Sequence, residues 1–401
     1  MNKEYQEKIE KIARENGTPI LIIDHSKIRK KYSEFRGRLP RVQVYYAVKA
    51  NSEPAILKTL FDLGSGFDVA SIQEFNIVAK LIEHLPPKQL QDFIWNNIIY
   101  ANPAKKPESL HFLNPYKPLL VYDSYEEMKK TKEHCPDAGL LLRINVPNDG
   151  SVVQLSNKFG IEPELAPDLI EKTINEGIGV EGISFHTGSQ CNNPSNFIKA
   201  LESVDYIFKQ VSSRGIKIGE TVTKGYPVKL VDIGGGFPVQ YDSTTNGQAF
   251  KSLSEILNRE FERLFPDNEE VNILAEPGRF LVAESGTSVS SVILAKNSSK
   301  IPCYYLDDGI YHTFSGMLFD HVPVELKSFR DGERLECRVF GPTCDGLDTL
   351  SENPYIKNTS KIYLPHLKEG DFVYSEKMGA YSNASATNFN GHAPAKVIHI
   401  K

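Results

Sequence analysis

The sequence of 401 residues has few of the features that mark secreted, membrane-bound or disulfide-rich proteins. Its five cysteines are an odd number at scattered positions, which is typical of reduced thiols rather than of a disulfide framework. No stretch approaches the roughly 18 consecutive apolar residues that a membrane-spanning helix needs. Residues 1–8 are rich in charge and lack the apolar core of a secretory leader. We therefore expect a soluble, cytoplasmic protein.

An excess of positive charge is also missing. The chain has 46 Lys and Arg against 51 Asp and Glu, which gives a net charge of −5. Proteins that bind nucleic acids or anionic membranes usually need a basic face, so we expect neither partner. Hydrophobic residues make up 40% of the chain, enough for a sizeable core, and the length suggests two or three domains at about 150 residues each.

What the sequence does contain is a regular alternation of apolar and amphipathic segments. Helical patterns follow several of the apolar runs, at Glu53–Leu63, Ser71–Ile82, Ser124–His134 and Asn196–Ser213. A series of eight units, each a strand followed by a helix, predicts a closed (β/α)₈ barrel of the TIM type. An open doubly wound sheet would show the same periodicity. The eight apolar runs are nearly unbroken, as in strands buried on both faces: Val42–Lys49, Gly66–Ser71, Asn97–Asn102, Leu119–Asp123, Leu140–Val146, Gly182–Ser189, Leu230–Pro238 and Asn272–Arg279.

Nearly all of these predicted strands end in groups that a core strand does not favour. Because all strands of a parallel barrel end at the same face, such groups would converge at one mouth and form an active site. The groups in question are Lys49, Asp68, Asn102, Arg143, His186, Ser189, the glycines 234–236, Glu276 and Arg279.

After about residue 285 the pattern changes to short alternating runs separated by Gly, Pro, Asp and Asn. This pattern predicts a second, β-rich domain of sandwich or barrel type. The resulting α/β chain divides into an N-terminal segment of residues 1–25 that packs on the β domain, a barrel of residues 26–285, and a β domain of residues 286–401.

Three features at the predicted strand ends carry chemistry when they are taken together. Lys49 is suited to forming a Schiff base if its amine is partly desolvated. The glycines 234–236 are suited to holding a phosphate with backbone N–H groups. Glu276 is suited to keeping a heterocyclic nitrogen protonated, with Arg279 beside it. Each feature alone has a simpler explanation (a surface lysine, a tight turn, an ion pair), but the combination outlines a pyridoxal-phosphate site.

The motifs around these residues resemble those of the fold-type III, alanine racemase-like, pyridoxal-phosphate decarboxylases. The family includes ornithine, diaminopimelate, arginine and carboxynorspermidine decarboxylases. Residues 100–103, 341–348, 379–381 and 389–391 are most similar to ornithine decarboxylase. The motifs of the family that carry the resemblance run in family order: Tyr46-Ala47-Val48-Lys49, Phe67-Asp68-Val69-Ala70-Ser71, His186-Thr187-Gly188-Ser189, Asp232-Ile233-Gly234-Gly235-Gly236 and Glu276-Pro277-Gly278-Arg279.

The resemblance implies pyridoxal 5′-phosphate as the cofactor and a role for each matching residue. Lys49 would form the Schiff base, Glu276 would bind the pyridine nitrogen and His186 would stack on the ring. Residues that would hold the phosphate are Ser189, Gly234, Gly235, Gly236, Arg279 and Tyr381. Residues that would surround the lysine and the ring are Asp68, Glu74 and Arg143. The resemblance further implies a homodimer with shared active sites, in which the partner subunit gives Tyr311, Cys344, Asp345 and Phe389.

The substrate is expected to be a basic L-amino acid. Asp320 and Asp345 match positions where ornithine decarboxylases bind the side-chain ammonium, and two carboxylates favour a cationic tail. Cys344 would return a proton to Cα. We expect ornithine to be converted to putrescine, or lysine to cadaverine, in polyamine biosynthesis. One methylene separates the two substrates, which is worth only about 1–3 kcal/mol in a pocket.

Other functions remain open on the sequence alone. Ala50-Asn51-Ser52 and Gln190 are more like the bacterial diaminopimelate and arginine branches, so diaminopimelate, arginine, diaminobutyrate or a modified ornithine are alternative substrates. A racemase would need no Cys-Asp turn. A non-catalytic regulator would have no reason to keep Lys49, Glu276 and Arg279. No metal site is predicted.

Overall fold

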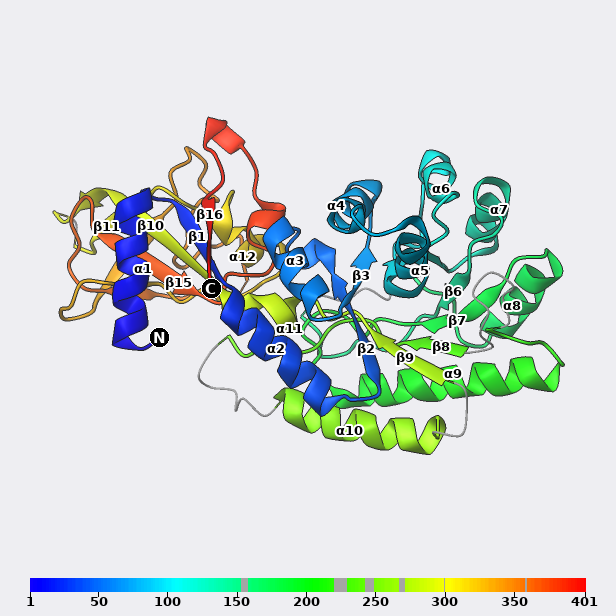
Figure 1. Cartoon of the computed structure of the whole chain (residues 1–401). Helices are drawn as coiled ribbons and strands as arrows, with labels where there is room; N and C mark the ends of the chain where they lie inside the picture. The colour runs from blue at the N-terminus through cyan, green and yellow to red at the C-terminus, as the bar shows by residue number, and fades with distance from the viewer. Residues whose placement is uncertain (153–157, 220–228, 242–248, 267–270, 299, 358) are drawn as a thin grey trace. The chain divides into compact units, whose positions relative to one another are not determined.

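The computed structural model describes residues 1–401 except 153–157, 220–228, 242–248, 267–270, 299 and 358 (Figure 1). The chain forms two compact units. The barrel unit comprises Tyr32–Val239 and Asn246–Gly278, and the β unit comprises Met1–Lys31, Gln240–Thr245 and Arg279–Lys401.

The barrel unit is built on a closed, parallel sheet of eight strands, which confirms the predicted (β/α)₈ fold and excludes the open sheet. The last strand closes on the first, with Val42 opposite Ile273. Every observed strand overlaps its predicted run but is shorter at the C-terminal end, so the predicted polar groups lie at or just beyond the strand ends. The strands are β2 (Val42–Ala47), β3 (Gly66–Val69), β4 (Ile98–Tyr100), β5 (Leu119–Tyr122), β6 (Leu140–Arg143), β7 (Val180–Ser184), β8 (Lys229–Asp232) and β9 (Val271–Ala275).

Helices connect these strands, and α9 and α10 lie side by side (Figure 1). All four predicted helical patterns are present, as α3 (Pro54–Asp62), α4 (Ile72–Ile82), α7 (Tyr125–His134) and α9 (Pro194–Ser213). Ser71 and Ser124 cap α4 and α7, where their side chains accept hydrogen bonds from Glu74 N and Glu127 N. The other connections contain η1 (Val48–Ala50), α5 (Pro87–Asn97), α6 (Pro107–Leu113), α8 (Ala166–Asn175) and α10 (Ala249–Leu264).

The β unit contains one twisted sheet in the order β12-β15-β10-β11-β13-β14, as the alternating pattern after residue 285 predicted. The N-terminal strand β1 (Ile20–Asp24) belongs to it, since β1 pairs antiparallel with β10 and parallel with β16. The strands of this sheet are β10 (Gly286–Lys296), β11 (Cys303–Leu306), β12 (Lys327–Ser328), β13 (Leu335–Phe340), β14 (Ile362–Leu364), β15 (Phe372–Glu376) and β16 (Lys396–Ile400).

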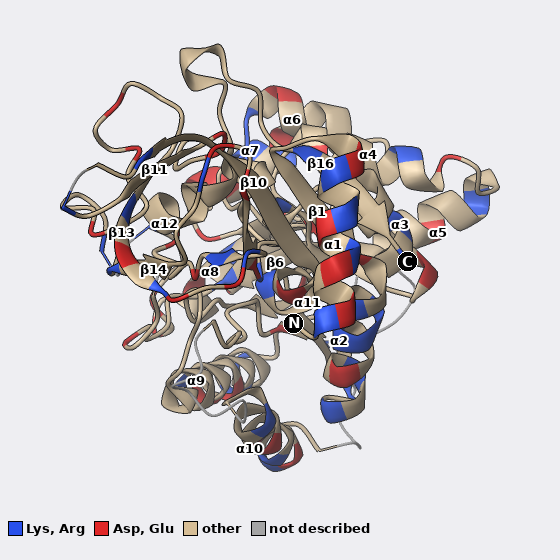
Figure 2. Cartoon of the chain, turned by 90° about the vertical axis from the view of Figure 1, so that its left-hand side faces the viewer, with Lys and Arg blue, Asp and Glu red and all other residues tan. Residues whose placement is uncertain are grey.

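The first helix, α1 (Lys3–Asn16), covers part of this sheet. Its buried residues Ile9 and Ala13 form a cluster with Ile20, Val289 and Tyr374. The helix also has closely spaced Lys, Arg and Glu residues, which are coloured along its ribbon in Figure 2. This division into an apolar stripe and a charged face explains why the segment packs on the β sheet.

The remaining elements are short, apart from α2 (His25–Arg38), which leads from the β unit into the barrel unit. They are α11 (Arg279–Val282), η2 (Ala283–Ser285), η3 (Thr313–Ser315), α12 (Gly316–Phe319), η4 (Asn383–Ser385) and η5 (Phe389–Gly391). Among the residues described, none of the helices combines the length and the apolar character that crossing a membrane requires. All five cysteines are free thiols.

Candidate active site

Lys49 and Asp68 form an ion pair at the ends of two neighbouring strands. Lys49 lies in the 3₁₀ turn that follows β2, and its Nζ is 2.8 Å from Asp68 Oδ2 in β3. The Asp68 side chain is 1% exposed, but that of Lys49 is 41% exposed. The Lys49 side chain is therefore partly shielded from solvent and still accessible, since it lies in the turn beyond the end of the strand.

A second carboxyl group, that of Glu74, lies close to this pair. The Ser71 cap starts α4 in such a way that Glu74 Oε2 accepts a 2.7 Å hydrogen bond from Ala70 N. Burial and the neighbouring Asp68 raise the pKa of Glu74, while the Ala70 hydrogen bond and Lys49 oppose the shift. The amine of Lys49 therefore has two carboxyl groups near it.

Glu276 and Asp232 are two buried carboxyl groups at neighbouring strand ends, since Asp232 is the last residue of β8 and Glu276 directly follows β9. Burial, followed by the charges of Asp232 and Asp68, raises the pKa of Glu276 well above its usual range. Burial also raises the pKa of Asp232, to about 6. The charge of Asp232 is the largest of the neighbouring charges that favour the protonated form of Glu276, and Asp232 Oδ2 has no hydrogen-bond partner among the described residues. No role was predicted for Asp232 from the sequence, although its place at the end of a strand is a usable signal.

Arg143, at the end of β6, lies among these carboxyl groups. Burial lowers the pKa of its guanidinium, and the charges of Glu276, Asp123 and Asp232 act in the opposite direction. Its Cζ lies 5.2 Å from the centre of the Phe159 ring. One buried cation thus compensates part of the negative charge that Asp232 and Asp68 bring to this end of the barrel.

His186, two residues after β7, is neutral in this setting. Burial, with the positive charges of Arg143 and Lys49, lowers its pKa well below the usual value. Its Nδ1 accepts a hydrogen bond from Gly188 N at 3.0 Å, which leaves the ring proton on Nε2. The imidazole is therefore an uncharged ring, suited to packing against another flat ring.

The glycine turn after β8 lies against the backbones of its neighbours. At Gly236, where φ is 92°, a Cβ atom would meet Gly188 O at 2.3 Å, and at Gly235 it would meet Glu276 O at 2.8 Å. Gly234 N donates to Asp232 Oδ1 at 2.9 Å. Within the part of the chain that the structure describes, the N–H groups of Gly235 and Gly236 have no acceptor. The turn therefore has no room for side chains at these positions and offers two N–H groups without an acceptor among the described residues.

Gln190 joins this turn to the loop after β7. Its Nε2 donates to Val239 O at 2.9 Å, and its Oε1 accepts from Val239 N at 2.8 Å. Ser189, the preceding residue, accepts a backbone hydrogen bond from Val152 N at 2.9 Å. In the sequence, Gln190 is only a departure from the ornithine decarboxylase pattern. In the structure, its side chain joins the loop that carries Ser189 to the loop that follows the glycines.

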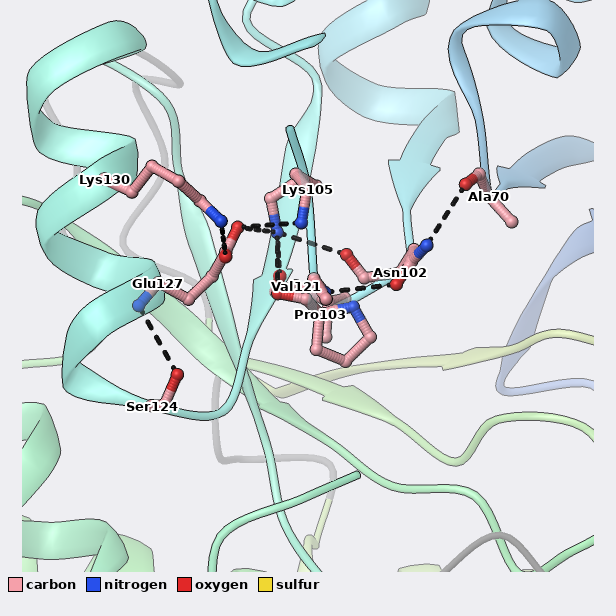
Figure 3. A network of polar contacts seen from close by, with 9 residues as sticks. Ala70, Asn102, Pro103, Lys105, Val121, Ser124, Glu127 and Lys130 are labelled. Carbon is pink, nitrogen blue, oxygen red and sulfur yellow. Dashed lines mark hydrogen bonds and ion pairs between the residues drawn. The ribbon is translucent and has the colours of Figure 1, made fainter. Parts of the chain in front are cut away.

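A buried ammonium group fixes the ends of β4 and β5 (Figure 3). Lys105 Nζ donates to Val121 O at 2.6 Å and Asn102 O at 3.1 Å, and it lies 3.0 Å from Glu127 Oε1. Asn102 Nδ2 in turn donates to Ala70 O at 3.5 Å (Figure 3), and Ala70 N donates to Glu74 Oε2. Asn102 thus acts as a link in the scaffold, and Lys105 is a supporting residue that the sequence analysis missed.

In the β unit, Arg279 forms a buried ion pair with Asp320. The exposed fractions of the two side chains are 5% and 12%. Arg279 Nη1 also donates to Tyr241 OH at 3.0 Å, and its Cζ lies 4.7 Å from the centre of the Tyr381 ring. Burial opposes the charge of Arg279, but Tyr241, Asp320 and Tyr381 together raise its pKa.

The four residues assigned to a partner subunit lie together on the β unit. The rings of Tyr311 and Phe389 stack, with centres 4.3 Å apart. Burial and the neighbouring Asp345 carboxylate raise the pKa of Tyr311, and Cys344 N donates to Asn390 Oδ1 at 3.1 Å. Cys344 is exposed, as expected for a thiol in a turn. Asp320 and Asp345, which the sequence analysis assigned to one substrate site, have different neighbours in the single chain.

The groups in the barrel unit fit pyridoxal 5′-phosphate. The amine of Lys49 is accessible to an aldehyde, and two N–H groups of the glycine turn match a phosphate. Buried Asp68 Oδ1 accepts no hydrogen bond from the described residues, which leaves an acceptor near the lysine. The Glu276–Asp232 pair needs a cationic or proton-accepting partner, and a pyridine nitrogen supplies one. No group of three or more metal-ligating side chains occurs in the same described part of the chain.

Comparison with known proteins agrees with this chemistry. A family profile described as "Pyridoxal-dependent decarboxylase, pyridoxal binding domain" matches residues 25–283. The chain belongs to this family. It is 34% identical over 394 residues to the lysine/ornithine decarboxylase of Selenomonas ruminantium, which covers 98% of this chain and 92% of the relative.

Solved structures of the family are similar over the whole chain. A crystal structure of a double mutant of SrLDC in complex with PLP has a TM-score of 0.87 at 33% identity, and the match covers 100% of this chain and 95% of the other. The lysine/ornithine decarboxylase of Vibrio vulnificus, complexed with putrescine, has a TM-score of 0.86 at 32% identity and covers 100% and 99% of the two chains. The protein is a pyridoxal phosphate-dependent decarboxylase of basic amino acids, within the ornithine/lysine decarboxylase family.

Proposed function

We propose that the protein converts L-ornithine to putrescine, with L-lysine to cadaverine as the second reaction of the same site, in cytoplasmic polyamine biosynthesis. What supports this choice is the presence of two carboxylates, Asp320 and Asp345, at the positions where the sequence resembles the ammonium-binding sites of ornithine decarboxylases, because carboxylates suit a substrate with a cationic tail. Asp345 directly follows the exposed Cys344 and lies beside Tyr311. The Vibrio vulnificus relative has also been crystallised with cadaverine, which supports a site that accepts both chain lengths.

The barrel unit holds the cofactor in this proposal. Lys49 binds it covalently, with Asp68 and Glu74 keeping the amine in position. Pyridoxal 5′-phosphate supplies the electron sink that makes the bond to the carboxylate labile. Glu276 would bind the pyridine nitrogen through a shared proton, and its burial together with the charge of Asp232 favours the presence of that proton at neutral pH.

Other residues position the cofactor. The uncharged His186 ring stacks on the pyridine, and Arg143 balances the charge of the surrounding carboxyl groups. Residues that we propose for the phosphate are Ser189, Gly235, Gly236, Arg279 and Tyr381. Gly234 contributes the backbone turn, because its own N–H is held by Asp232.

Two copies of the chain complete each site in this proposal. Tyr311, Phe389, Cys344 and Asp345 form a cluster with an exposed thiol, and the 39% exposed Phe389 ring gives it an apolar edge. In a homodimer this cluster serves the site of the partner. Cys344 donates a proton to Cα once CO₂ has left, and Asp345 binds the distal ammonium.

A substrate panel tests the proposed reaction. CO₂ release is measured from ornithine, lysine, arginine, diaminopimelate and diaminobutyrate at equal concentrations, with the diamine product identified by chromatography. We expect ornithine and lysine to be the best substrates, separated by a ratio within about 10–200-fold, the range that one methylene allows. Preference for diaminopimelate, arginine or diaminobutyrate would overturn the proposed substrate class while leaving the cofactor chemistry intact.

Mixing two inactive variants tests the shared site. In the proposed dimer, Lys49 and Cys344 of the same site come from different subunits, and the variants Lys49→Ala and Cys344→Ala each remove one of them. We expect activity to reappear when the two variants are mixed and allowed to exchange subunits, since mixed dimers then hold one complete site. Activity that stays absent in a mixture with demonstrated exchange would mean that each chain completes its own site.

A further inference from the structure

Asp320 binds the guanidinium of Arg279, which is also the group proposed to bind the cofactor phosphate. Arg279 gives its Nη2 side to Asp320 and its Nη1 side to Tyr241. Both side chains of the pair are largely buried, so the Asp320 carboxylate neutralises the Arg279 cation at a place that water reaches poorly. A phosphate dianion at Arg279 would meet this carboxylate, and two anions on one cation repel each other.

The residues around the pair form a tied framework that keeps Asp320 near Arg279. Ser315, just before the short helix α12 that leads to Asp320, is hydrogen-bonded to Ser385 through their hydroxyl groups at 2.8 Å. Ser385 Oγ also donates to Tyr381 O at 3.0 Å. Asp320 N donates to Gly316 O at 3.1 Å, which closes α12. The segments that carry Asp320 and Tyr381 are thus joined, and the carboxylate can change partner by side-chain rotation while its backbone stays in place.

We propose that Asp320 couples the binding of cofactor and substrate by exchanging partners. Without ligands Asp320 neutralises Arg279. When the cofactor phosphate takes over Arg279, the carboxylate is released, and the cationic tail of the substrate replaces Arg279 as its partner. Each ligand therefore removes the competitor of the other, and thermodynamic reciprocity requires the diamine to tighten phosphate binding by the same factor by which phosphate tightens diamine binding.

This inference rests on the proposed function, because it takes phosphate to Arg279 and the ammonium to Asp320. Its new content is that phosphate binding at Arg279 and ammonium binding at Asp320 strengthen each other. An Asp320 that served only to bind the substrate would leave the phosphate affinity of the free protein unchanged. An Asp320 that served only to orient Arg279 would weaken phosphate binding when removed.

The test uses the full chain freed of cofactor, with pyridoxine 5′-phosphate as the probe. This compound carries the phosphate but no aldehyde, so its binding does not depend on covalent attachment to Lys49. Its affinity is measured by titration calorimetry with and without saturating putrescine, for the wild type, Asp320→Asn, Asp320→Glu and Asp371→Asn. Asp371 is a matched control, since it pairs with Arg330 elsewhere in the same unit.

We expect putrescine to tighten binding of the probe to the wild type at least about fivefold, the lower end of usual coupling between sites. Asp320→Asn should bind the probe more tightly than the wild type when putrescine is absent, and putrescine should no longer change that affinity. Asp320→Glu should retain the coupling, and Asp371→Asn should behave as the wild type.

Two results would overturn the inference. One is weaker binding of the probe by Asp320→Asn, and the other is an unaltered probe affinity in wild type on adding putrescine, a measurement that needs no variant. Failure of the proposed function is distinct, because it would appear as a wild type that releases no CO₂ from ornithine or lysine in the presence of pyridoxal 5′-phosphate.

Discussion

Lys49 Nζ lies 2.8 Å from Asp68 Oδ2, although Lys49 is accessible and Asp68 is buried. The carboxylate is fixed within β3, and the amine reaches it from the turn after the adjacent strand β2. The pair therefore joins an accessible amine to a buried acceptor. Such an arrangement holds the lysine in place and still allows it to react with an aldehyde.

Lys49→Ala should remove covalent attachment of the cofactor and lower decarboxylation by at least about a hundredfold, the lower end of the loss expected for a proton-transferring group. Borohydride reduction followed by peptide mass spectrometry measures attachment, and visible absorbance measures the loss of the imine between the lysine and the cofactor. Lys58→Ala is the control, because Lys58 is an exposed lysine paired with Asp62 on α3. A reduced adduct on any other lysine of the wild type would contradict the assignment.

Cys344→Ala should lower turnover by about 10²–10⁴-fold, the usual contribution of a positioned acid. It should also raise the share of pyridoxamine phosphate formed by misplaced protonation, because the thiol no longer directs the proton to Cα. Product partition is measured by chromatography of the cofactor after many turnovers. Cys303→Ala, at a partly buried cysteine of the same unit, is the control. An unchanged partition would remove Cys344 as the proton donor.

The sequence predicted the barrel because eight buried strands leave a periodic apolar pattern that survives without any knowledge of tertiary contacts. It also located Lys49, Glu276 and the glycine turn, since polar groups at strand ends are visible locally. The role of Asp232 was missed, because its pairing with Glu276 depends on two strands becoming neighbours. Likewise, the Arg279–Asp320 ion pair joins residues 41 apart in the chain, and only packing reveals it.

Lys105→Met should destabilise the protein by about 3–5 kcal/mol, because it leaves Glu127 and strand-end carbonyl groups buried without their ammonium partner. The retained contact of Lys130 with Glu127, at 2.5 Å, places the expected loss at the lower end of this range. Urea unfolding followed by circular dichroism measures the change. Lys117→Met removes a surface ion pair with Asp137 and should cost at most about 1 kcal/mol. Equal effects of the two substitutions would show that burial of Lys105 adds nothing.

Asp308 gives the protein a predictable dependence of stability on pH. Its side chain is fully buried and accepts hydrogen bonds from Gly309 N at 2.9 Å and Thr313 N at 3.1 Å. Burial raises its pKa to about 7. In the unfolded chain the pKa of an aspartate is about 3.9. Because the folded pKa is the higher one, the stabilising contribution is complete below about pH 4 and is lost as the pH rises through 7.

Asp308→Asn should abolish this dependence, because the amide oxygen can accept the same two hydrogen bonds without taking on a charge. Relative to the wild type, the variant should gain about 1–3 kcal/mol between pH 5 and pH 8, from 1.36 kcal/mol for each unit of pKa. Urea unfolding midpoints at the two pH values measure the difference, and the exposed Asp331→Asn is the control. The prediction fails if the free energies of unfolding of the wild type and Asp308→Asn differ by the same amount at pH 5 and pH 8. Asp308 would then carry the same charge in the folded and the unfolded chain, and a neighbouring group would have to stabilise it in the folded protein.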